Sequence, residues 1–139
     1  EMDGKRAQFF SINKWVTEVI QDAQGTVTSK ATVTINAQGK EIVSEGTGNG
    51  PVNAIDTALR SGLGTIYPEI SGFELTDYKV RILEGRQGTG AITRVLVETS
   101  DDTGEWNTVG VHENVIAASA MALEDALTYG LLRKGRLPQ

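Results

Sequence analysis

The sequence has no cysteine and a single histidine, and these absences remove several classes of chemistry. Without cysteine there are no disulfides, thiolate nucleophiles or thiolate metal sites, which fits a reducing cytoplasm. His112 lies just before an expected helix, where a lone histidine is more often a surface residue than a catalytic base. No pair of carboxylates and no histidine–carboxylate cluster has the spacing of a zinc or iron site. We therefore expect no catalytic residue, no metal and no cofactor in these residues.

Positive charge is also scarce. Lysine and arginine number 13 against 18 aspartates and glutamates, so the net charge is −5, and neither half carries a basic block. Nucleic acid is therefore not an expected partner. No apolar run approaches the roughly 20 residues that a membrane span requires, and the N-terminus lacks the apolar segment of a signal peptide. We expect one cytoplasmic domain with no membrane partner, an N-terminal extension over residues 1–8 and a tail over residues 134–139.

Alternating apolar and polar residues predict strands in the first half of the chain. The apolar face of residues 26–35 consists of Val27, Ala31, Val33 and Ile35. The runs 10–20 and 39–46 are rich in β-branched and aromatic residues, and residues 36–40 have the composition of a hairpin turn. After residue 50 the apolar positions recur at helical spacing, at Val52, Ile55, Leu59 and Leu63. The first half therefore predicts three strands followed by a helix.

The second half repeats this pattern at a constant offset of 64 residues. The offset aligns Val16 with Val80, Val33 with Val97, Gly46 with Gly110, Gly50 with Asn114 and Leu59 with Leu123. It predicts strands over residues 75–85, 91–100 and 105–112 and a helix over residues 114–132. The fold class is α+β, with two βββα units related by a pseudo-twofold, residues 9–63 and 73–133, joined by a linker over residues 64–72.

This order predicts antiparallel strands with helices on one face, as one six-stranded sheet covered by two helices. Two helices leave part of such a sheet uncovered, and small alanines on both helices allow close helix approach. We therefore expect a homodimer.

The segment GTGNGP, residues 46–51, has several possible roles. Gly50 is expected at the N-cap of the first helix and Pro51 at its first position, which leaves exposed amides at the positive end of the helix dipole. A Walker loop is excluded because Lys and Ser/Thr do not follow, and a dinucleotide fingerprint would need a parallel βαβ unit. A plain glycine cap and a small anion site remain. The second helix begins at Asn114 without a glycine cluster, which favours the anion site.

The strand over residues 75–85 has two different faces. Asp77, Lys79 and Arg81 share a face that is expected to be solvated. Tyr78 lies among aliphatic residues on the other, which predicts either core or the wall of a pocket. Trp15 and Trp106 fit apolar sheet faces and are expected in the core.

Four motifs together resemble one family. They are GTGNGPVNAIDTAL, LTDYKVRIL, GTGAITRVLVE and WNTVGVHENVIAASAMALEDAL. In this order they resemble the C-terminal regulatory domain of the 2-isopropylmalate synthase and citramalate synthase family, over about residues 9–133. The resemblance implies two βββα units, a homodimer, and binding of the pathway's end-product amino acid at or near the dimer interface as a feedback inhibitor. Isoleucine, the effector of the citramalate branch, is preferred to leucine, and homocitrate synthase-like relatives remain open.

The resemblance also implies a parent acyltransferase. Its N-terminal catalytic TIM barrel would use a divalent metal and condense acetyl-CoA with a 2-oxo acid, and this domain would be its non-catalytic partner. Two other hypotheses are a dimerisation module without a ligand site and an independent small enzyme, which the lack of a catalytic cluster disfavours.

The resemblance implies an effector site made of three segments. Backbone groups at the first helix start would hold the polar end of the amino acid, at Asn49, Gly50, Val52 and Asn53. The side-chain pocket would be lined by Leu75, Tyr78 and Ile82, with a further wall from Gly90, Ala91 and Ile92. Asn53 and Gly90 depart from the residues common in the leucine-binding branch, so they bear on pocket size and ligand choice.

Overall fold

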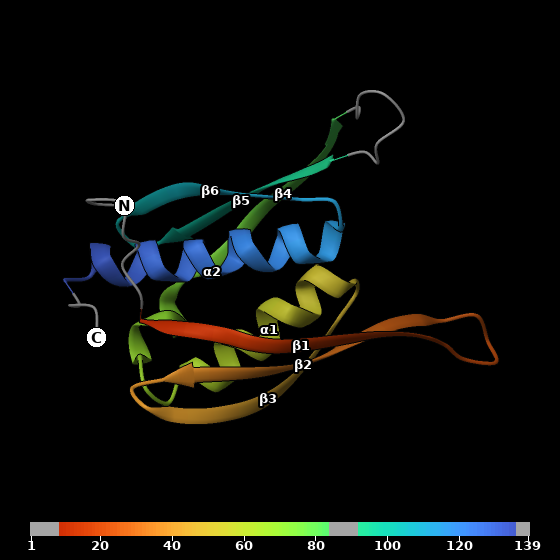
Figure 1. Ribbon diagram of the computed structural model, residues 1–139, viewed down its shortest axis with the longest axis horizontal. Coiled ribbons are helices and arrows are strands. Elements are labelled where there is room, and N and C mark those ends of the chain that lie inside the picture. The colour runs from red at the N-terminus through yellow and green to blue at the C-terminus, as the bar shows by residue number, and fades with distance from the viewer. Residues whose placement is uncertain (1–8, 84–91, 136–139) are drawn as a thin grey trace. The chain divides into compact units, whose positions relative to one another are not determined.

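The computed structural model describes residues 9–83 and 92–135 (Figure 1). These residues divide into two compact units, one reaching Ser71 and including the segment from Leu131, the other running from Gly72 to Gly130. Each unit contains a three-stranded antiparallel sheet whose last strand leads into a helix.

The first unit is built on a sheet with strand order β1-β2-β3. Its elements are β1 (Phe10–Gln21), β2 (Val27–Ala37), β3 (Lys40–Gly48), α1 (Pro51–Leu63) and a short 3₁₀ helix (Pro68–Gly72). The turn between β2 and β3 has positive φ angles at Gln38 (53°) and Gly39 (76°), which matches the twist of a tight hairpin. In Figure 1 the β1–β2 hairpin extends well past the end of α1.

The core of this unit lies between α1 and one face of the sheet. Val33 and Ile35 of β2 and Ile55 and Leu59 of α1 are fully buried, as the alternation and helical spacing predict. Tyr67, which follows α1, donates a hydrogen bond from its hydroxyl to the Phe9 carbonyl at 3.0 Å. This bond satisfies a buried phenol and fixes the segment after the helix.

The second unit has strand order β4-β5-β6. Its elements are β4 (Glu74–Leu83), β5 (Ile92–Asp101), β6 (Gly104–His112) and α2 (Val115–Arg133). Trp106 of β6 is 6% exposed and its indole Nε1 donates to the Ala126 carbonyl of α2 at 3.0 Å. The expectation that Trp106 belongs to the core is confirmed. Trp15, on β1, is half-buried.

The predicted repeat is confirmed by the bounds of the elements. Adding 64 to the bounds of β3 (40–48) gives 104–112, the bounds of β6, and adding 64 to the start of α1 (51) gives 115, the start of α2. The prediction of a single six-stranded sheet is wrong, because each unit forms its own three-stranded sheet. Alternation within a strand specifies which face is buried and carries no information on which strands pair.

Helix α2 bears on a second expectation. We predicted no segment able to cross a membrane, yet Val115–Arg133 is long and apolar enough by length and composition. Of the apolar 18-residue stretch of this helix, 56% is buried, and Leu123, Ala126 and Leu127 are each about 1% exposed. A buried helix of a soluble domain has this composition, and we interpret α2 as a core helix.

Candidate functional site

Two of the three glycines before α1 are explained by packing. A Cβ on Gly46 would collide with the backbone N of Ala58 and lie 2.7 Å from the Ala54 carbonyl oxygen. A Cβ on Gly48 would lie 2.7 Å from the Cβ of Asn53. Since real Cβ atoms do not approach this closely, these glycines allow β3 to lie directly against α1.

The second unit solves the same packing problem in the same way. Gly110 of β6 corresponds to Gly46, and a Cβ on it would collide with the Ala118 carbonyl of α2. The glycine cluster as a whole is therefore no evidence for a ligand, which corrects our interpretation of it. Gly50 alone has no packing explanation, because nothing lies within 4 Å of a Cβ built on it.

The N-terminus of α1 has exposed hydrogen-bond donors. Gly50 is the N-cap, with φ −147° and ψ 172°, and no side chain caps the helix. The first helical bond runs from the Ala54 N–H to the Gly50 carbonyl at 3.0 Å. Within the described part of the chain, the N–H groups of Val52 and Asn53 therefore have no acceptor, at the positive end of the helix dipole.

The N-terminus of α2 is closed by contrast. The Asn114 side-chain oxygen accepts from the N–H groups of Ile116 (2.8 Å) and Ala117 (3.0 Å), which confirms the predicted cap. His112 Nδ1 accepts from the Asn114 N–H at 2.9 Å, so its ring supports the turn before the helix. Of the two helix starts, α1 is the one with amides available to an anion.

A β-bulge assembles the predicted pocket residues of β4 on one face. Leu75 pairs with Thr99, Tyr78 with Val97 and Ile82 with Thr93, and the register shifts between Leu75 and Asp77. Because alternate residues of β5 share a face, all three β4 residues point to the same side. Residues 75 and 78 would face opposite ways in a regular strand, and the bulge brings them together.

Tyr78 and Ser119 form a polar pair beside these aliphatic residues. The Tyr78 and Ser119 hydroxyl oxygens lie 3.2 Å apart, and the Ser119 hydroxyl donates to the Val115 carbonyl at 2.8 Å. A hydroxyl has one proton, so in this arrangement Tyr78 donates to Ser119 and keeps its own lone pairs. The phenol oxygen can then accept a hydrogen bond from a ligand ammonium. Ser119 was missed at the sequence level, where it is one small residue in an alanine-rich helix.

The exposure of this face varies along β4. Leu75 and Tyr78 are half-buried, whereas Ile82 is 68% exposed near the end of the strand. Ile82 lies four residues along the strand from Tyr78, with Val80 between them on the same face, and its exposed side chain is available to an apolar partner or ligand.

The remaining predicted residues lie on several elements of the two units. Asn49 and the Asn53 side chain are exposed, and Ile92 pairs with Leu83, which places it on the face of the sheet opposite Ile82. Gly90 and Ala91 lie outside the described residues. The residues at α1 belong to the first unit, and those of β4 and β5 belong to the second. Among the described residues, no group of acidic, histidine or cysteine side chains is arranged to hold a metal.

Comparison with known proteins identifies the family. A family model described as the LeuA allosteric (dimerisation) domain matches residues 1–131. The chain belongs to this family. The two βββα units that the resemblance implied are present in the fold described above.

The LeuA domain is similar to the corresponding part of several curated enzymes. It is 54% identical over 138 residues to an (R)-citramalate synthase of Streptomyces coelicolor, covering 99% of this chain and 26% of that enzyme. It is 52% identical over 101 residues to an (R)-citramalate synthase of Synechocystis, covering 73% of this chain and 18% of that enzyme. A 2-isopropylmalate synthase of Aquifex aeolicus is 36% identical over 104 residues, which cover 75% of this chain and 18% of the enzyme. The chain thus spans about a fifth to a quarter of the length of these relatives.

Proposed function

We propose that this LeuA domain binds a branched-chain amino acid, isoleucine in preference to leucine, and transmits feedback inhibition to a cytoplasmic acyltransferase of which it is a part. The parent enzyme would condense acetyl-CoA with a 2-oxo acid in a separate catalytic barrel, where we expect the divalent metal. Identity above 50% to two citramalate synthases supports isoleucine, the end product expected for that branch. We also propose that the domain acts as a homodimer, in keeping with the family's description.

The observation that carries the proposal is the face of β4 around Tyr78. It combines aliphatic side chains, Leu75 and Ile82, with a phenol oxygen able to accept from an ammonium group. An apolar surface with a few placed polar groups is typical of small-molecule sites. The available amides of Val52 and Asn53 have the chemistry to bind a carboxylate.

The choice between amino acids depends on the apolar part of the ligand. Isoleucine exceeds valine by one methylene, and such a difference in an apolar pocket is worth about 1 to 3 kcal/mol. We expect binding in the order isoleucine, leucine, valine, with roughly 10-fold or more between isoleucine and valine.

Calorimetric titration of the 139-residue chain with isoleucine, leucine and valine tests the proposal directly. An Ile82→Asp variant should lose binding, because it puts a charge on the apolar face. Val43 of β3 is a matched control: it is 63% exposed, close to the 68% of Ile82, and lies on the first sheet. Val43→Asp should bind as the wild type does. No heat with any of the three amino acids, while the chain remains folded and dimeric, would favour a dimerisation module without a ligand.

A further inference from the structure

The face of the second sheet that points away from α2 carries a cluster of positive charge. Arg81 lies opposite Arg94 in the β4–β5 register. Lys79 lies opposite Leu96, one row further along the same face. Directly opposite residues have Cβ atoms about 4.5 to 5.5 Å apart and diagonal neighbours about 7 to 8 Å, within reach of long side chains. Three corners of this square are therefore cations able to converge on one ligand, and we call Lys79, Arg81 and Arg94 the basic cluster.

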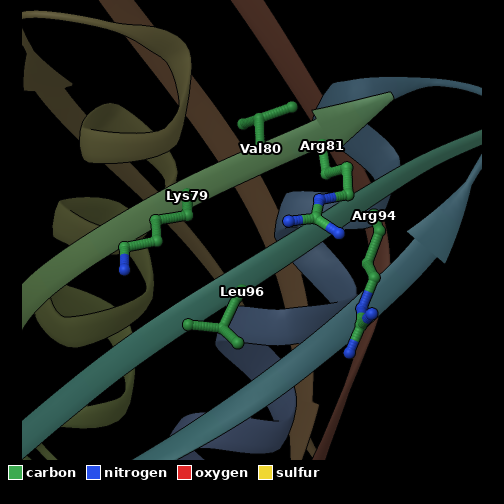
Figure 2. Close-up of a pocket in the computed structure, with 5 residues that line it drawn as sticks. All are labelled: Lys79, Val80, Arg81, Arg94 and Leu96. Atoms are coloured by element: carbon green, nitrogen blue, oxygen red, sulfur yellow. The ribbon is translucent and has the colours of Figure 1, made fainter. Parts of the chain in front are cut away.

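The basic cluster borders a hollow in the surface. The hollow has a volume of about 490 Å³ and is lined by Lys79, Val80, Arg81, Arg94 and Leu96. Figure 2 shows both guanidinium groups on the side of the sheet that carries Lys79 and Leu96, with Val80 pointing the other way. Small-molecule sites typically measure about 300 to 1,000 Å³, so the hollow is large enough for a small organic molecule.

The charges of the basic cluster are not neutralised by their surroundings. Arg81 and Arg94 are exposed, and neither forms an ion pair or hydrogen bond through its side chain within the described part of the protein. Lys79 contacts Asp77 at 3.8 Å, but the two side chains are 73% and 44% exposed, and such a surface pair contributes little. An excess of positive charge therefore gathers here in a chain whose net charge is −5.

The third strand adds an apolar surface beside the cluster. Val109 of β6 lies opposite Leu96 and is 36% exposed, and Val111 lies opposite Arg94 and is 46% exposed. Leu96 itself is half-buried. The hollow thus combines cationic side chains with aliphatic ones, which suits a ligand that has a charged part and a less polar part.

The acidic residues of this face lie one row further along the strands. Asp77 is opposite Glu98, and the Glu98 carboxylate accepts a hydrogen bond from the Thr76 hydroxyl at 2.8 Å. Thr76 lies at the bulge of β4, further from the basic cluster than Asp77. This bond holds the Glu98 carboxylate on the side away from the hollow.

The first unit shows the same position with its charges paired internally. Both β1 and β4 contain a bulge, and the fifth pair after it is Glu18–Lys30 in the first sheet and Arg81–Arg94 in the second. Lys30 also contacts Glu45 at 3.6 Å. Opposite charges stabilise a cross-strand pair and like charges destabilise it. Since the fold accommodates a complementary pair at this position, it does not require two arginines, and a bound anion would offset their repulsion.

We propose that the basic cluster binds a small phosphate-bearing anion. A guanidinium presents paired N–H donors that match phosphate oxygens. A phosphate monoester carries about 1.5 to 2 negative charges at neutral pH and three strong acceptor oxygens, whereas a single carboxylate would leave most of the positive charge uncompensated. Leu96, Val109 and Val111 offer the surface on which an esterified group would rest.

This site goes beyond the proposed function and is separate from the effector site. Tyr78 and Ile82 alternate with Lys79 and Arg81 along β4, so the two sites occupy opposite faces of one strand. Substitutions in the basic cluster should therefore leave isoleucine affinity unchanged.

Calorimetric titration of the 139-residue chain with inorganic pyrophosphate, adenosine 5′-diphosphate and malate tests the ligand class. Both phosphate compounds should bind about 10-fold or more tighter than malate, a dicarboxylate, and added sodium chloride should weaken their binding by screening. Tighter binding of adenosine 5′-diphosphate than of pyrophosphate supports a site for an organic ester. Equal affinities support a site for the inorganic anion.

Paired substitutions test the location. Arg81→Gln with Arg94→Gln should weaken pyrophosphate binding about 100-fold or more, because each arginine contributes a hydrogen bond to a charged group, worth roughly 10- to 100-fold. The control Lys14→Gln with Lys40→Gln removes the same charge from exposed positions of the first sheet and should bind as the wild type does. Pyrophosphate should raise the Tm of the wild type and of the control, and leave that of the arginine variant unchanged.

Several results would overturn the site. These are no binding of either phosphate compound to the folded wild type, affinity for malate equal to that for pyrophosphate, and equal weakening in the arginine variant and the lysine control, which would indicate attraction by overall charge. Loss of isoleucine binding in an arginine variant with a wild-type circular dichroism spectrum would overturn the separation of the two sites.

Discussion

Substitution of Gly50 by asparagine separates the stability of α1 from its capacity to bind an anion. Gly50 already has the extended conformation of an N-cap, and nothing lies within 4 Å of a Cβ at this position. Asparagine therefore fits without strain, and its side-chain oxygen can accept from the Val52 and Asn53 N–H groups, as Asn114 does on α2. Asparagine and glycine differ at N-caps by only a few tenths of a kcal/mol, so we expect the free energy of unfolding to stay constant or rise slightly.

The effect on ligand affinity should be much larger. The new side chain occupies the two N–H donors of the first unit that we propose as a carboxylate-binding group. A hydrogen bond to a charged group is worth about 1.5 to 3 kcal/mol, so loss of one such bond predicts roughly 10- to 100-fold weaker binding of isoleucine. Calorimetric titration gives this affinity, and urea denaturation of the same preparation gives the stability.

The reverse substitution at the N-cap of the second helix is the control. Asn114→Gly removes the α2 cap, costs a few tenths of a kcal/mol and should leave isoleucine affinity unchanged. Wild-type affinity in Gly50→Asn would refute the placement of the carboxylate at α1. A clear loss of stability in that variant would refute the inference that the position is open.

Three further outcomes are expected. Gly46→Ala should destabilise the fold by about 1 to 3 kcal/mol or more in chemical denaturation, because the methyl group meets the backbone of α1, whereas Gly72→Ala, with nothing within 4 Å, should be near neutral. Tyr78→Phe should weaken isoleucine binding about 10-fold or more and cost only about 0.5 to 1.5 kcal/mol of stability, and unchanged affinity would remove the phenol from the site. Burial, only partly offset by the ion pair with Arg60 at 2.9 Å, raises the pKa of Asp56 above 3.8. The contribution of Asp56 to stability is therefore fully present below pH 3.8 and is lost as the pH rises through the raised pKa of the folded state. The stability of wild type relative to Asp56→Asn should fall over that pH range. A stability difference that stays flat or rises with pH would contradict this.

Several features of the fold have local signals in the sequence. The strands, both helices, the Asn114 cap and the tight turn at Gln38 and Gly39 all follow from residues within a few positions of one another. The pairing of strands into two separate sheets has no such signal. One six-stranded sheet and two three-stranded sheets would bury the same alternating faces of the strands, so sequence periodicity does not distinguish them.

The candidate site also combines residues that the sequence predicts with contacts that form only in the folded protein. Tyr78 and Leu75 were predicted from their aliphatic surroundings and a family resemblance, but a strand of period two would separate them. The bulge that joins them depends on how β4 pairs with β5. Ser119 comes from a helix 41 residues further along, and its contact with Tyr78 exists only in the folded unit.

The amino-acid sequence by itself determined the duplication, the order of strands and helices, and the family, because these depend on spacing along the chain. The tertiary structure decided what the glycines do. Gly46 and Gly110 are glycines because a helix backbone lies where a Cβ would be, whereas Gly50 has open space beside it. It also decided that Arg81 and Arg94 lie opposite one another at one end of a sheet and Glu98 and Asp77 at the other, because cross-strand register brings together residues that are distant in sequence.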